Sequence, residues 1–246
     1  MKKFLEASNG LAALLVEKSN YDGIWISSLC HAATKGFPDN ELVPLKERIE
    51  LVEEIKRITT KPIMVDIDTG GDIRHVPYYV QWFESAGAWA VVIEDKKYPK
   101  ENSLLNTEHQ LEDVDIFCEK IRTAKWASKN ILIIARLESL IAKKSVNDAL
   151  IRAGAYLDAG ADGILIHSKE EISATEVMEF AERFRKISDK TLIAIPTTYK
   201  LPENHPFDIV IYANHLLRAS LKGMQNYLDG KEDLAEVEDI FKIVGK

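Results

Sequence analysis

The chain has 246 residues, of which 46% are hydrophobic and 29% charged, with a formal net charge of −7 at pH 7. This charge argues against nucleic acid or an anionic membrane as a main partner, but not against a small anion held by a local cluster of cations. The sequence has no long apolar run and no signal-peptide pattern, and its only cysteines are Cys30 and Cys118. We therefore expect a cytoplasmic protein without a membrane segment.

Short apolar runs that suit buried strands recur along the chain, at residues 4–6, 23–28, 62–68, 90–95, 131–138, 163–168, 191–197 and 208–214. Amphipathic segments of helical spacing lie between them, at residues 10–18, 45–58, 76–85, 113–128, 146–159 and 174–186. Strands that alternate with helices pair in parallel through right-handed crossovers. The pattern predicts an α/β fold with one domain over residues 1–246, a (β/α)8 TIM-type barrel, with an open doubly wound sheet as the alternative.

The chain continues beyond the eighth predicted strand with more helix than one strand–helix unit requires. After the last predicted strand come two helical segments, at residues 216–228 and 232–244. The second, an extra C-terminal helix, carries apolar residues at helical spacing: Leu234, Val237, Ile240, Phe241 and Val244. Such a stripe needs a partner, which is either the chain's own barrel or another subunit.

In a parallel barrel, the residues that end each strand converge on one face, where catalytic groups are found. The polar or aromatic residues at these ends are Glu6, Ser8, Asn9, Trp25, Ser27, Ser28, Asp66, Asp68, Glu94, Asp95, Arg136, Glu138, His167, Ser168, Lys169, Thr197, Thr198, Asn214 and His215. Two adjacent strands thus end in carboxylates, at Asp66 and Asp68 and at Glu94 and Asp95. The sequence predicts one shared site at this face.

The carboxylates Asp66, Asp68 and Glu94 are hard oxygen ligands, which suit Mg²⁺. Asp66 and Asp68 stand two apart in the predicted strand and would share a face of it. No Cys or His spacing favours zinc, and no lysine lies between these acids to compensate them. A solvated strand end is the alternative, and we favour a magnesium site.

Two basic residues at strand ends each allow two interpretations. Arg136 follows a buried run, so its guanidinium needs an anion, which is either Glu138 or a substrate phosphate or carboxylate. His167 is either a structural residue or, given its neighbours, part of the site. Cys30 has no visible histidine partner, and we expect a small buried residue there rather than a nucleophile.

Together these residues resemble the phosphoenolpyruvate mutase branch of the isocitrate lyase superfamily. The resemblance covers nearly the whole chain and rests on motifs in one order and spacing. They are Glu-Ala-Ser-Asn-Gly-Leu at residues 6–11, Trp-Ile-Ser-Ser-Leu at 25–29, Pro-Asp-Asn-Glu at 38–41, Asp-Ile-Asp-Thr-Gly at 66–70, Glu-Asp-Lys at 94–96, Pro-Lys-Glu-Asn-Ser-Leu at 99–104, Ala-Arg-Leu-Glu at 135–138, His-Ser-Lys at 167–169 and Ala-Asn-His at 213–215 with Leu217, Arg218 and Ala219.

The resemblance implies a modified barrel whose last helix swaps between neighbouring subunits, giving a homo-oligomer that is a dimer of helix-swapped dimers. It implies Mg²⁺ as the cofactor, with Asp66 as the direct ligand and Asp68 and Glu94 acting through water. The substrates implied are small α-keto acids or enol phosphates, with no nucleic acid or membrane partner.

The resemblance also assigns roles around the substrate. Ser27 and the backbone amides of Ser28 and Leu29 would hold the carboxylate and the enolate oxygen, Asp39 would lie beside the migrating phosphoryl group, and residues 96–104 would form a gating lid. The substrate-binding residues implied are Trp25, Ser27, Ser28, Leu29, Asp66, Lys100, Asn102, Ser103, Leu104, Arg136 and His167. The catalytic residues implied are Asp39, Lys100, Asn102, Arg136 and His167.

The activity implied is that of an isomerase in phosphonate biosynthesis, the Mg²⁺-dependent interconversion of phosphoenolpyruvate and 3-phosphonopyruvate. The lid lacks the cysteine that carbon–carbon lyases of the superfamily use there, and Asn102 stands where phosphonopyruvate hydrolases typically have threonine. A phosphonopyruvate hydrolase and a catalytically silent barrel that binds a keto acid are the alternatives. Ser28 departs from the family pattern, in which glycine is common, as does the loop at residues 71–73.

Overall fold

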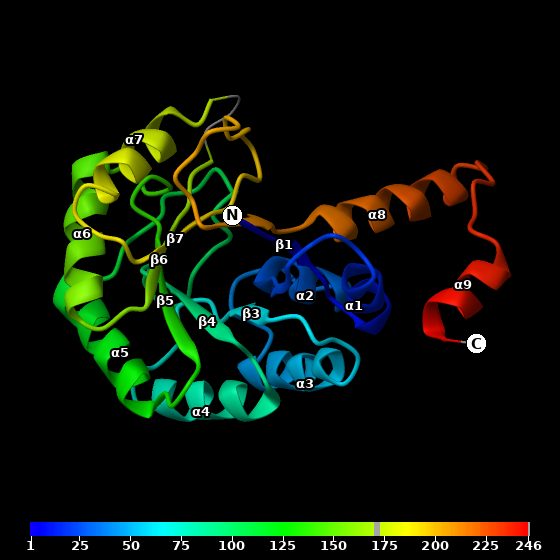
Figure 1. Cartoon of the computed structure of the whole chain (residues 1–246), viewed down its shortest axis with the longest axis horizontal. Coiled ribbons are helices and arrows are strands. Elements are labelled where there is room, and N and C mark those ends of the chain that lie inside the picture. The colour runs from blue at the N-terminus through cyan, green and yellow to red at the C-terminus, as the bar shows by residue number, and fades with distance from the viewer. Residues whose placement is uncertain (170–172, 246) are drawn as a thin grey trace.

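The computed structural model describes residues 1–169 and 173–245, and within them the strands close into a parallel barrel surrounded by helices (Figure 1). The strands are β1 (Lys2–Glu6), β2 (Gly23–Ile26), β3 (Ile63–Asp66), β4 (Ala90–Glu94), β5 (Leu132–Leu137), β6 (Gly163–Ile166), β7 (Thr191–Ala194) and β8 (Ile209–Tyr212). Neighbours along the chain pair in parallel, and β8 pairs with β1, where Ile209 stands opposite Lys2. The predicted barrel is confirmed, and the open sheet is wrong.

The helices alternate with the strands as predicted, except that α2 and α3 both lie between β2 and β3 and that β8 follows β7 directly in the described element order. They are α1 (Gly10–Glu17), α2 (Ser28–Thr34), α3 (Leu45–Lys56), α4 (Val76–Ala86), α5 (Val114–Ala127), α6 (Val146–Asp158), α7 (Thr175–Phe184), α8 (His215–Leu228) and α9 (Val237–Val244). Side chains of Asn9, Asp113 and Ser145 accept backbone N–H groups at the starts of α1, α5 and α6, which explains where these helices begin. Helix α2 was not predicted, because its seven residues are too few to show a periodic apolar pattern.

Alternation along the strands produces two apolar cores. One side of each strand packs inside the barrel, where Phe4, Met64, Val92 and Ile134 lie among other buried side chains. The other side, such as Leu5, Val65, Val91 and Ile133, packs against the helices. A strand that is covered on both faces has a continuous apolar run in its sequence, which is why the strands could be predicted.

Strand β1 ends at Glu6 as predicted, whereas the other strands end earlier than predicted, because the last residues of their apolar runs leave the sheet. In the run at 23–28, Ser27 caps α2 by accepting the N–H of Cys30, and Ser28 is the first residue of that helix. A serine there takes helical backbone angles and needs no glycine. Asp68 lies two residues beyond β3 with a φ of 55°, so the expected strand alternation does not place it beside Asp66.

Helices α8 and α9 form an arm that projects from the barrel (Figure 1). Neither helix has a buried residue, and the apolar residues of α9 are about half exposed. The arm is fixed at its two ends. Glu6 Oε2 accepts the N–H groups of Leu216 and Leu217 at the start of α8, and Lys18 Nζ donates to the last carbonyls of α9. The apolar stripe therefore still lacks a cover in the described part of the chain.

Helix α9 is shorter than predicted. The sequence suggested a helix over 232–244, whereas the structure begins it at Val237. The residues from Glu232 to Glu236 are mostly charged and all exposed, so no packing favours a helix there.

We expect the arm to be covered by another subunit. Light scattering should give an oligomer for the full chain and a smaller mass for a variant that ends at Gly230, because removal of α9 takes away its apolar stripe. A monomeric full-length chain would contradict the expectation. A full-length variant with Asp239→Asn, a change on the charged side of α9, serves as the control and should keep the oligomer.

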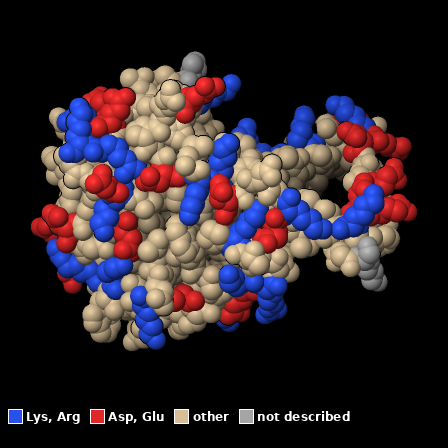
Figure 2. All heavy atoms as spheres, in the orientation of Figure 1, with Lys and Arg blue, Asp and Glu red and all other residues tan. Residues whose placement is uncertain are grey.

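On the face in view, lysines and arginines are interspersed with aspartates and glutamates over both barrel and arm (Figure 2). None of the helices in the described residues combines the length and the apolar character needed to cross a membrane. Cys30 and Cys118 are free and buried, as expected for Cys30. Burial raises the pKa of the Cys30 thiol, and its Sγ donates to the Ala213 carbonyl, so it is no nucleophile.

Candidate active site

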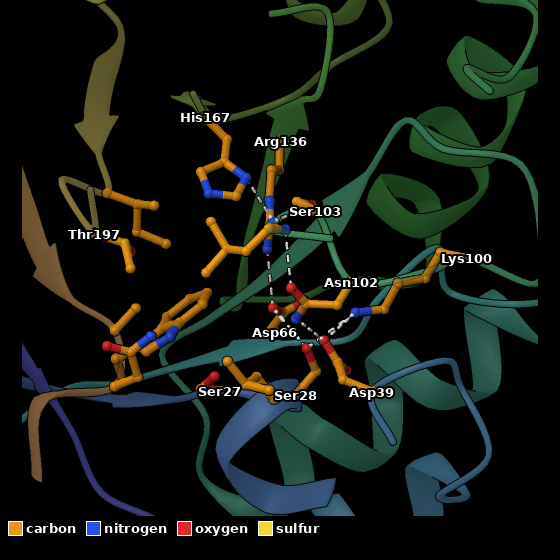
Figure 3. A pocket seen from close by; sticks show the side chains of 16 residues that line it. Ser27, Ser28, Asp39, Asp66, Lys100, Asn102, Ser103, Arg136, His167 and Thr197 are labelled. Atoms are coloured by element: carbon orange, nitrogen blue, oxygen red, sulfur yellow. Dashed lines mark hydrogen bonds and ion pairs between the residues drawn. The ribbon is translucent and has the colours of Figure 1, made fainter. Parts of the chain in front are cut away.

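A cavity of about 400 Å³, its mouth included, lies at the carboxyl ends of the strands (Figure 3). Its lining contains every residue that the sequence assigned to substrate binding, together with Asp39. The lining residues are Trp25, Ser27, Ser28, Leu29, Asp39, Asp66, Lys100, Asn102, Ser103, Leu104, Arg136, His167, Ile195, Thr197, Ala213 and Asn214. The structure thus brings the predicted residues together, while their roles remain predictions.

The charged side chains above the barrel core are placed by strand alternation. Each stands two residues after a side chain of the inner core and therefore points the same way. Asp66 follows Met64, Glu94 follows Val92, Arg136 follows Ile134 and His167 follows Leu165. Since Asp95 is one residue out of phase, it faces the helices, where it accepts from Tyr156 Oη and Arg152 Nη1. Of the two acids that end β4, only Glu94 belongs to the site.

Arg136 pairs with Glu138, one of the two partners that the sequence allowed, and the other, a substrate anion, stays a prediction. Its Nε donates to Glu138 Oε1 at 2.5 Å and its Nη1 to Asp66 Oδ2 at 3.1 Å, and the side chain also lines the cavity. Burial opposes the charge of Arg136, but Glu138, Glu94 and Asp66 outweigh it and raise the pKa of the guanidinium. Arg136 is therefore a permanent cation at the wall of the cavity.

His167 can take two tautomers. Its Nδ1 lies 2.8 Å from both Arg136 Nη2 and Glu138 Oε1. The guanidinium only donates and the carboxylate only accepts, so a neutral imidazole can serve one of them at a time. Burial lowers the pKa of His167 to about 4, which keeps the ring neutral at pH 7. When Nδ1 accepts from Arg136, the proton is on Nε2 and is available to an anion in the cavity.

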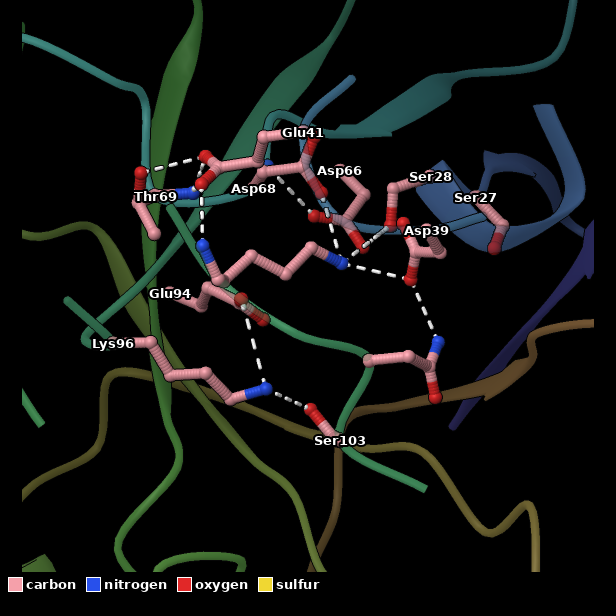
Figure 4. Close-up of polar contacts among 12 residues, drawn as sticks. Ser27, Ser28, Asp39, Glu41, Asp66, Asp68, Thr69, Glu94, Lys96 and Ser103 are labelled. Carbon is pink, nitrogen blue, oxygen red and sulfur yellow. Dashed lines mark hydrogen bonds and ion pairs between the residues drawn. The ribbon is translucent and has the colours of Figure 1, made fainter. Parts of the chain in front are cut away.

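The lid, residues 96–104, lies over Asp39 (Figures 3 and 4). Asp39 Oδ2 accepts from Lys100 Nζ at 2.8 Å and from Asn102 Nδ2 at 2.6 Å. Lys100 Nζ also lies 3.1 Å from Asp68 Oδ1, and these acids outweigh burial and raise its pKa. Asn102 Oδ1 accepts the N–H of Leu104, so both ends of its amide are engaged. Two lid side chains thus converge on one carboxylate at the cavity.

Within the lid, Ser103 connects the acidic ends of β4 and β5. Its Oγ donates to Glu138 Oε2 at 2.7 Å and accepts from Lys96 Nζ. Lys96 is buried between Glu94 and Glu138, at 3.8 and 3.5 Å. Burial would raise the pKa of Glu138, but Arg136 and His167 hold it well below its usual range. Glu138 is therefore an anion at the centre of this group.

The acids of the predicted metal site are compensated by cations, contrary to the sequence expectation. Arg48, which is buried in α3, donates from Nη1 to Asp68 Oδ2 at 2.8 Å and to the Asp66 carbonyl at 2.7 Å. Burial would raise the pKa of Asp68, but Arg48 and Lys100 keep it below the usual range. These cations lie far from the acids in sequence, so inspection of the intervening residues could not find them.

The acids nevertheless suit a hydrated magnesium ion. No three His, Cys, Asp or Glu side chains of the described residues are gathered closely enough to hold a metal by themselves. Mg²⁺ keeps several waters and takes only one or two carboxylates directly, so one ligand with others acting through water fits this arrangement. Within the described structure, both carboxylate oxygens of Glu94 are buried without a hydrogen bond, and their nearest cations, Arg136 Nη2 and Lys96 Nζ, lie at 3.4 and 3.8 Å. Such oxygens can accept from water bound to a cation.

The charges of the site also leave room for a cation. Among the described residues, five buried carboxylates meet four buried cations in two adjoining groups of ion pairs, which hydrogen bonds at Asp66 connect. The acids are Asp39, Asp66, Asp68, Glu94 and Glu138, and the cations are Arg48, Lys96, Lys100 and Arg136. Burial raises the pKa of Glu94 to about 7, with Lys96 and Arg136 opposing it. A trianionic ligand would need an additional cation to enter here.

The opposite wall has polar atoms available to a ligand. Within the described residues, Trp25 Nε1 and Asn214 Oδ1 are buried without a hydrogen-bond partner. Both side chains line the cavity beside the apolar Ile195 and Ala213. Buried polar groups are nearly always paired in folded proteins, so a donor and an acceptor left open at a cavity indicate a ligand.

Two residues of the site were not assigned by the sequence. Arg48 lies on a helix rich in charged residues, where nothing distinguishes it from its exposed neighbours. Glu41 belongs to the Pro-Asp-Asn-Glu motif, but its contacts depend on how the loops fold. The only available signal for Glu41 was the motif itself.

A closed parallel barrel whose charged side chains gather at the carboxyl ends of its strands defines a TIM-barrel enzyme. The family model described as phosphoenolpyruvate phosphomutase matches residues 2–230, and the chain belongs to this family. The resemblance inferred from the motifs is thereby confirmed.

Named relatives in this family carry out different reactions. The chain is 36% identical to a phosphonopyruvate hydrolase of Variovorax sp. (strain Pal2), over 88% of this chain and 77% of the relative. It is 33% identical to the phosphoenolpyruvate phosphomutase of Tetrahymena pyriformis, over 98% and 86%. It is also 31% identical to a 2-methylisocitrate lyase of Halalkalibacterium halodurans, over 89% and 73%. Overall identity therefore fixes the family and leaves the reaction to be decided at the site.

Solved structures of two family members share the fold. The phosphoenolpyruvate phosphomutase of Streptomyces platensis subsp. rosaceus is 33% identical, with a TM-score of 0.93 over 100% of this chain and 91% of that one. A phosphonopyruvate hydrolase in complex with oxalate and Mg²⁺ is 32% identical, with a TM-score of 0.89 over 100% and 90%. The fold is therefore the same in a mutase and in a hydrolase.

Proposed function

We propose that this protein is a phosphoenolpyruvate mutase, which interconverts phosphoenolpyruvate and 3-phosphonopyruvate. The observation that carries the proposal is the convergence of Asn102 and Lys100 on Asp39 under a closed lid. Membership of the family supports it, as do relatives named phosphomutase. The alternative is phosphonopyruvate hydrolysis, which the similarly related hydrolase supports.

The reaction rearranges one molecule. The bond between phosphorus and the enol oxygen of phosphoenolpyruvate breaks, and a bond between phosphorus and the methylene carbon forms, with no atom gained or lost. The protein must hold a loosely bonded phosphoryl group while the enolate turns its carbon towards it. It must also exclude water, because water at the phosphoryl group would produce pyruvate and phosphate.

The lid residues suit the first of these tasks. Lys100 and Asn102 donate to Asp39 in this structure, and an entering phosphoryl group can take over these donors. Arg136 and the Nε2–H tautomer of His167 supply further donors from the other side. Asp39, freed from its donors, then lies beside the phosphoryl group, where it can orient that group.

Residues at the strand ends suit the pyruvate part. Ser27 and Ser28, at the start of α2, present a hydroxyl and backbone N–H groups to the cavity. The start of a helix favours an anion such as the substrate carboxylate. Asp66 would hold a Mg²⁺ directly and Asp68 and Glu94 would hold it through water, and its positive charge would stabilise the enolate oxygen.

Lyase chemistry is not supported by the lid. The lid contains no cysteine, and both cysteines of the chain are buried elsewhere. A carbon–carbon lyase needs a group to carry the proton of the cleavage step. The charged lid residue at the cavity, Lys100, is held by Asp39 and Asp68 and has a raised pKa, so it does not serve as a base at neutral pH.

The test is ³¹P NMR of the purified protein with phosphonopyruvate and Mg²⁺. We expect the signal of phosphoenolpyruvate to appear at the expense of phosphonopyruvate. Inorganic phosphate as the chief product would replace the mutase by a hydrolase, and an unchanged spectrum would indicate a binding protein. The protein with EDTA in place of Mg²⁺ is the control and should leave phosphonopyruvate unchanged.

A further inference from the structure

Glu41 joins three loops at the mouth of the cavity (Figure 4). It lies two residues after Asp39, in the loop that follows α2. Its Oε1 accepts from the backbone N–H of Thr69 at 3.1 Å and from the Thr69 hydroxyl at 2.6 Å. Its Oε2 accepts from the backbone N–H of Lys100 at 2.7 Å. One carboxylate thus connects the loop after β3 to the lid.

The Thr69 side of this bridge is fixed. Thr69 is fully buried, and its carbonyl accepts from the buried Lys120 Nζ at 2.7 Å. Its hydroxyl oxygen also accepts from the N–H of Gly71. Glu41 itself has a φ of 63°, a region that side chains disfavour and that the surrounding contacts must maintain. The loop after β3 therefore serves as a rigid support for the glutamate.

The Lys100 side of the bridge belongs to the lid. The Glu41 contact fixes the backbone of Lys100, from which its side chain extends to Asp39, Asp68 and Ser28. If the lid moves away, the Lys100 N–H leaves the carboxylate, and the ammonium leaves the cavity with it. A charged acceptor makes this a stronger hydrogen bond than a neutral one.

We propose that Glu41 is the latch of the lid, a positioning residue that holds the Lys100 backbone against Thr69 and thereby places the Lys100 ammonium at the cavity. The latch acts through Lys100 and does not contact the substrate. It links closure of the lid to the position of the Asp39 loop, because Glu41 and Asp39 are in the same loop. Its consequence for the reaction rests on the proposed function, whereas lid closure itself can be measured without any reaction.

Limited digestion with trypsin measures lid closure directly. Lys100 is buried in the closed lid, so cleavage after it requires opening, whereas Lys231 is exposed in the connection between α8 and α9. In the wild type, both Lys100 and Thr69 donate to the Glu41 carboxylate. In Glu41→Gln, the amide N–H₂ replaces one of the two acceptor oxygens, so one of these donors loses its acceptor. We expect cleavage after Lys100, relative to Lys231, to be about tenfold faster than in the wild type. Glu41→Ala removes both acceptors and should give at least the same increase.

The control variant is Glu108→Gln, which makes the same chemical change in the segment that follows the lid and leaves the residues beside the cleaved bond unaltered. Glu108 is exposed, and its carboxylate has no hydrogen bond or ion pair in the described structure, so its cleavage ratio should stay that of the wild type. Thr69→Val, which removes the 2.6 Å hydroxyl contact, should raise the ratio by itself. It should add little when combined with Glu41→Gln, because both changes act on one bridge.

A second readout is turnover with phosphonopyruvate. Glu41→Gln should lower kcat more than it raises KM, and the share of inorganic phosphate among the products should rise as water enters. An unchanged cleavage ratio in both Glu41 variants would overturn the latch. An equal rise in the rate of cleavage after Arg152, a buried residue of α6, would also overturn the latch. It would mean that the substitutions loosen the whole protein and not the lid alone. If the wild type forms no phosphoenolpyruvate, the proposed function fails, while the cleavage ratio still decides the latch.

Discussion

Asp66→Asn is expected to lower turnover on the order of 10³-fold while the barrel stays folded. A neutral amide is a poor ligand for Mg²⁺, and Asp66 is the proposed direct ligand. The amide N–H₂ would also face Arg136 Nη1, which now donates to Asp66 Oδ2. Folding should be retained, because loss of this carboxylate leaves the buried acids and cations of the described site equal in number.

The measurement is the rate of conversion of phosphonopyruvate, followed by ³¹P NMR, with a thermal melt to verify folding. Asp72→Asn is the matched control, since Asp72 lies in the exposed part of the same loop and pairs only with Arg74. EDTA should reduce the wild type to the same level, and added Mg²⁺ should restore it. Activity that survives both the substitution and the chelator would remove the metal from the mechanism.

Asn102→Thr is expected to lower mutase turnover about 10²-fold and to raise the proportion of hydrolysis. The asparagine amide donates to Asp39 and accepts from the Leu104 N–H at the same time. The shorter threonine hydroxyl cannot span both partners, and the smaller side chain leaves space for a water beside the phosphoryl group. Lys100 still holds Asp39, so the loop should keep its place.

Product analysis decides this prediction. Phosphoenolpyruvate is quantified against pyruvate and phosphate for the wild type, for Asn102→Thr and for Asn106→Thr. The last variant makes the same change at an exposed position four residues further on and should behave as the wild type. If Asn102→Thr left both the rate and the products unchanged, Asn102 would be only a loop residue, whose type suits a turn.

Much of the fold could be predicted because a barrel strand is buried on both faces. Each strand therefore appears as an apolar run, and the residue two positions after an inner core residue can be assigned to the site. Asp66, Glu94, Arg136 and His167 were found as polar residues that end these runs, a criterion that also selected Asp95, which faces the helices. The roles of Asp39, Lys100 and Asn102 came from resemblance, since a loop has no such periodicity.

The electrostatics of the site could not be predicted from sequence. Arg48 comes from a helix and Lys100 from the lid, and each reaches Asp68 only because the chain folds back over the barrel, whereas Lys96 stands two residues after Glu94, with which it pairs. Strand alternation predicted that Asp68 shares a face of the strand with Asp66, but the positive φ of Asp68 places it outside the strand. Backbone conformation and long side chains decide such contacts, and neither has a sequence period.

The pairing of the first strand with the last has a consequence for how the protein forms during synthesis. Because β1 pairs with β8, and Ile209 stands opposite Lys2, the barrel cannot close until almost the whole chain has left the ribosome. Until then β1 and the growing end of the sheet are open edges that can pair with other strands. Contacts so distant in sequence form slowly, so closure is the step at which a nascent chain is most exposed to aggregation.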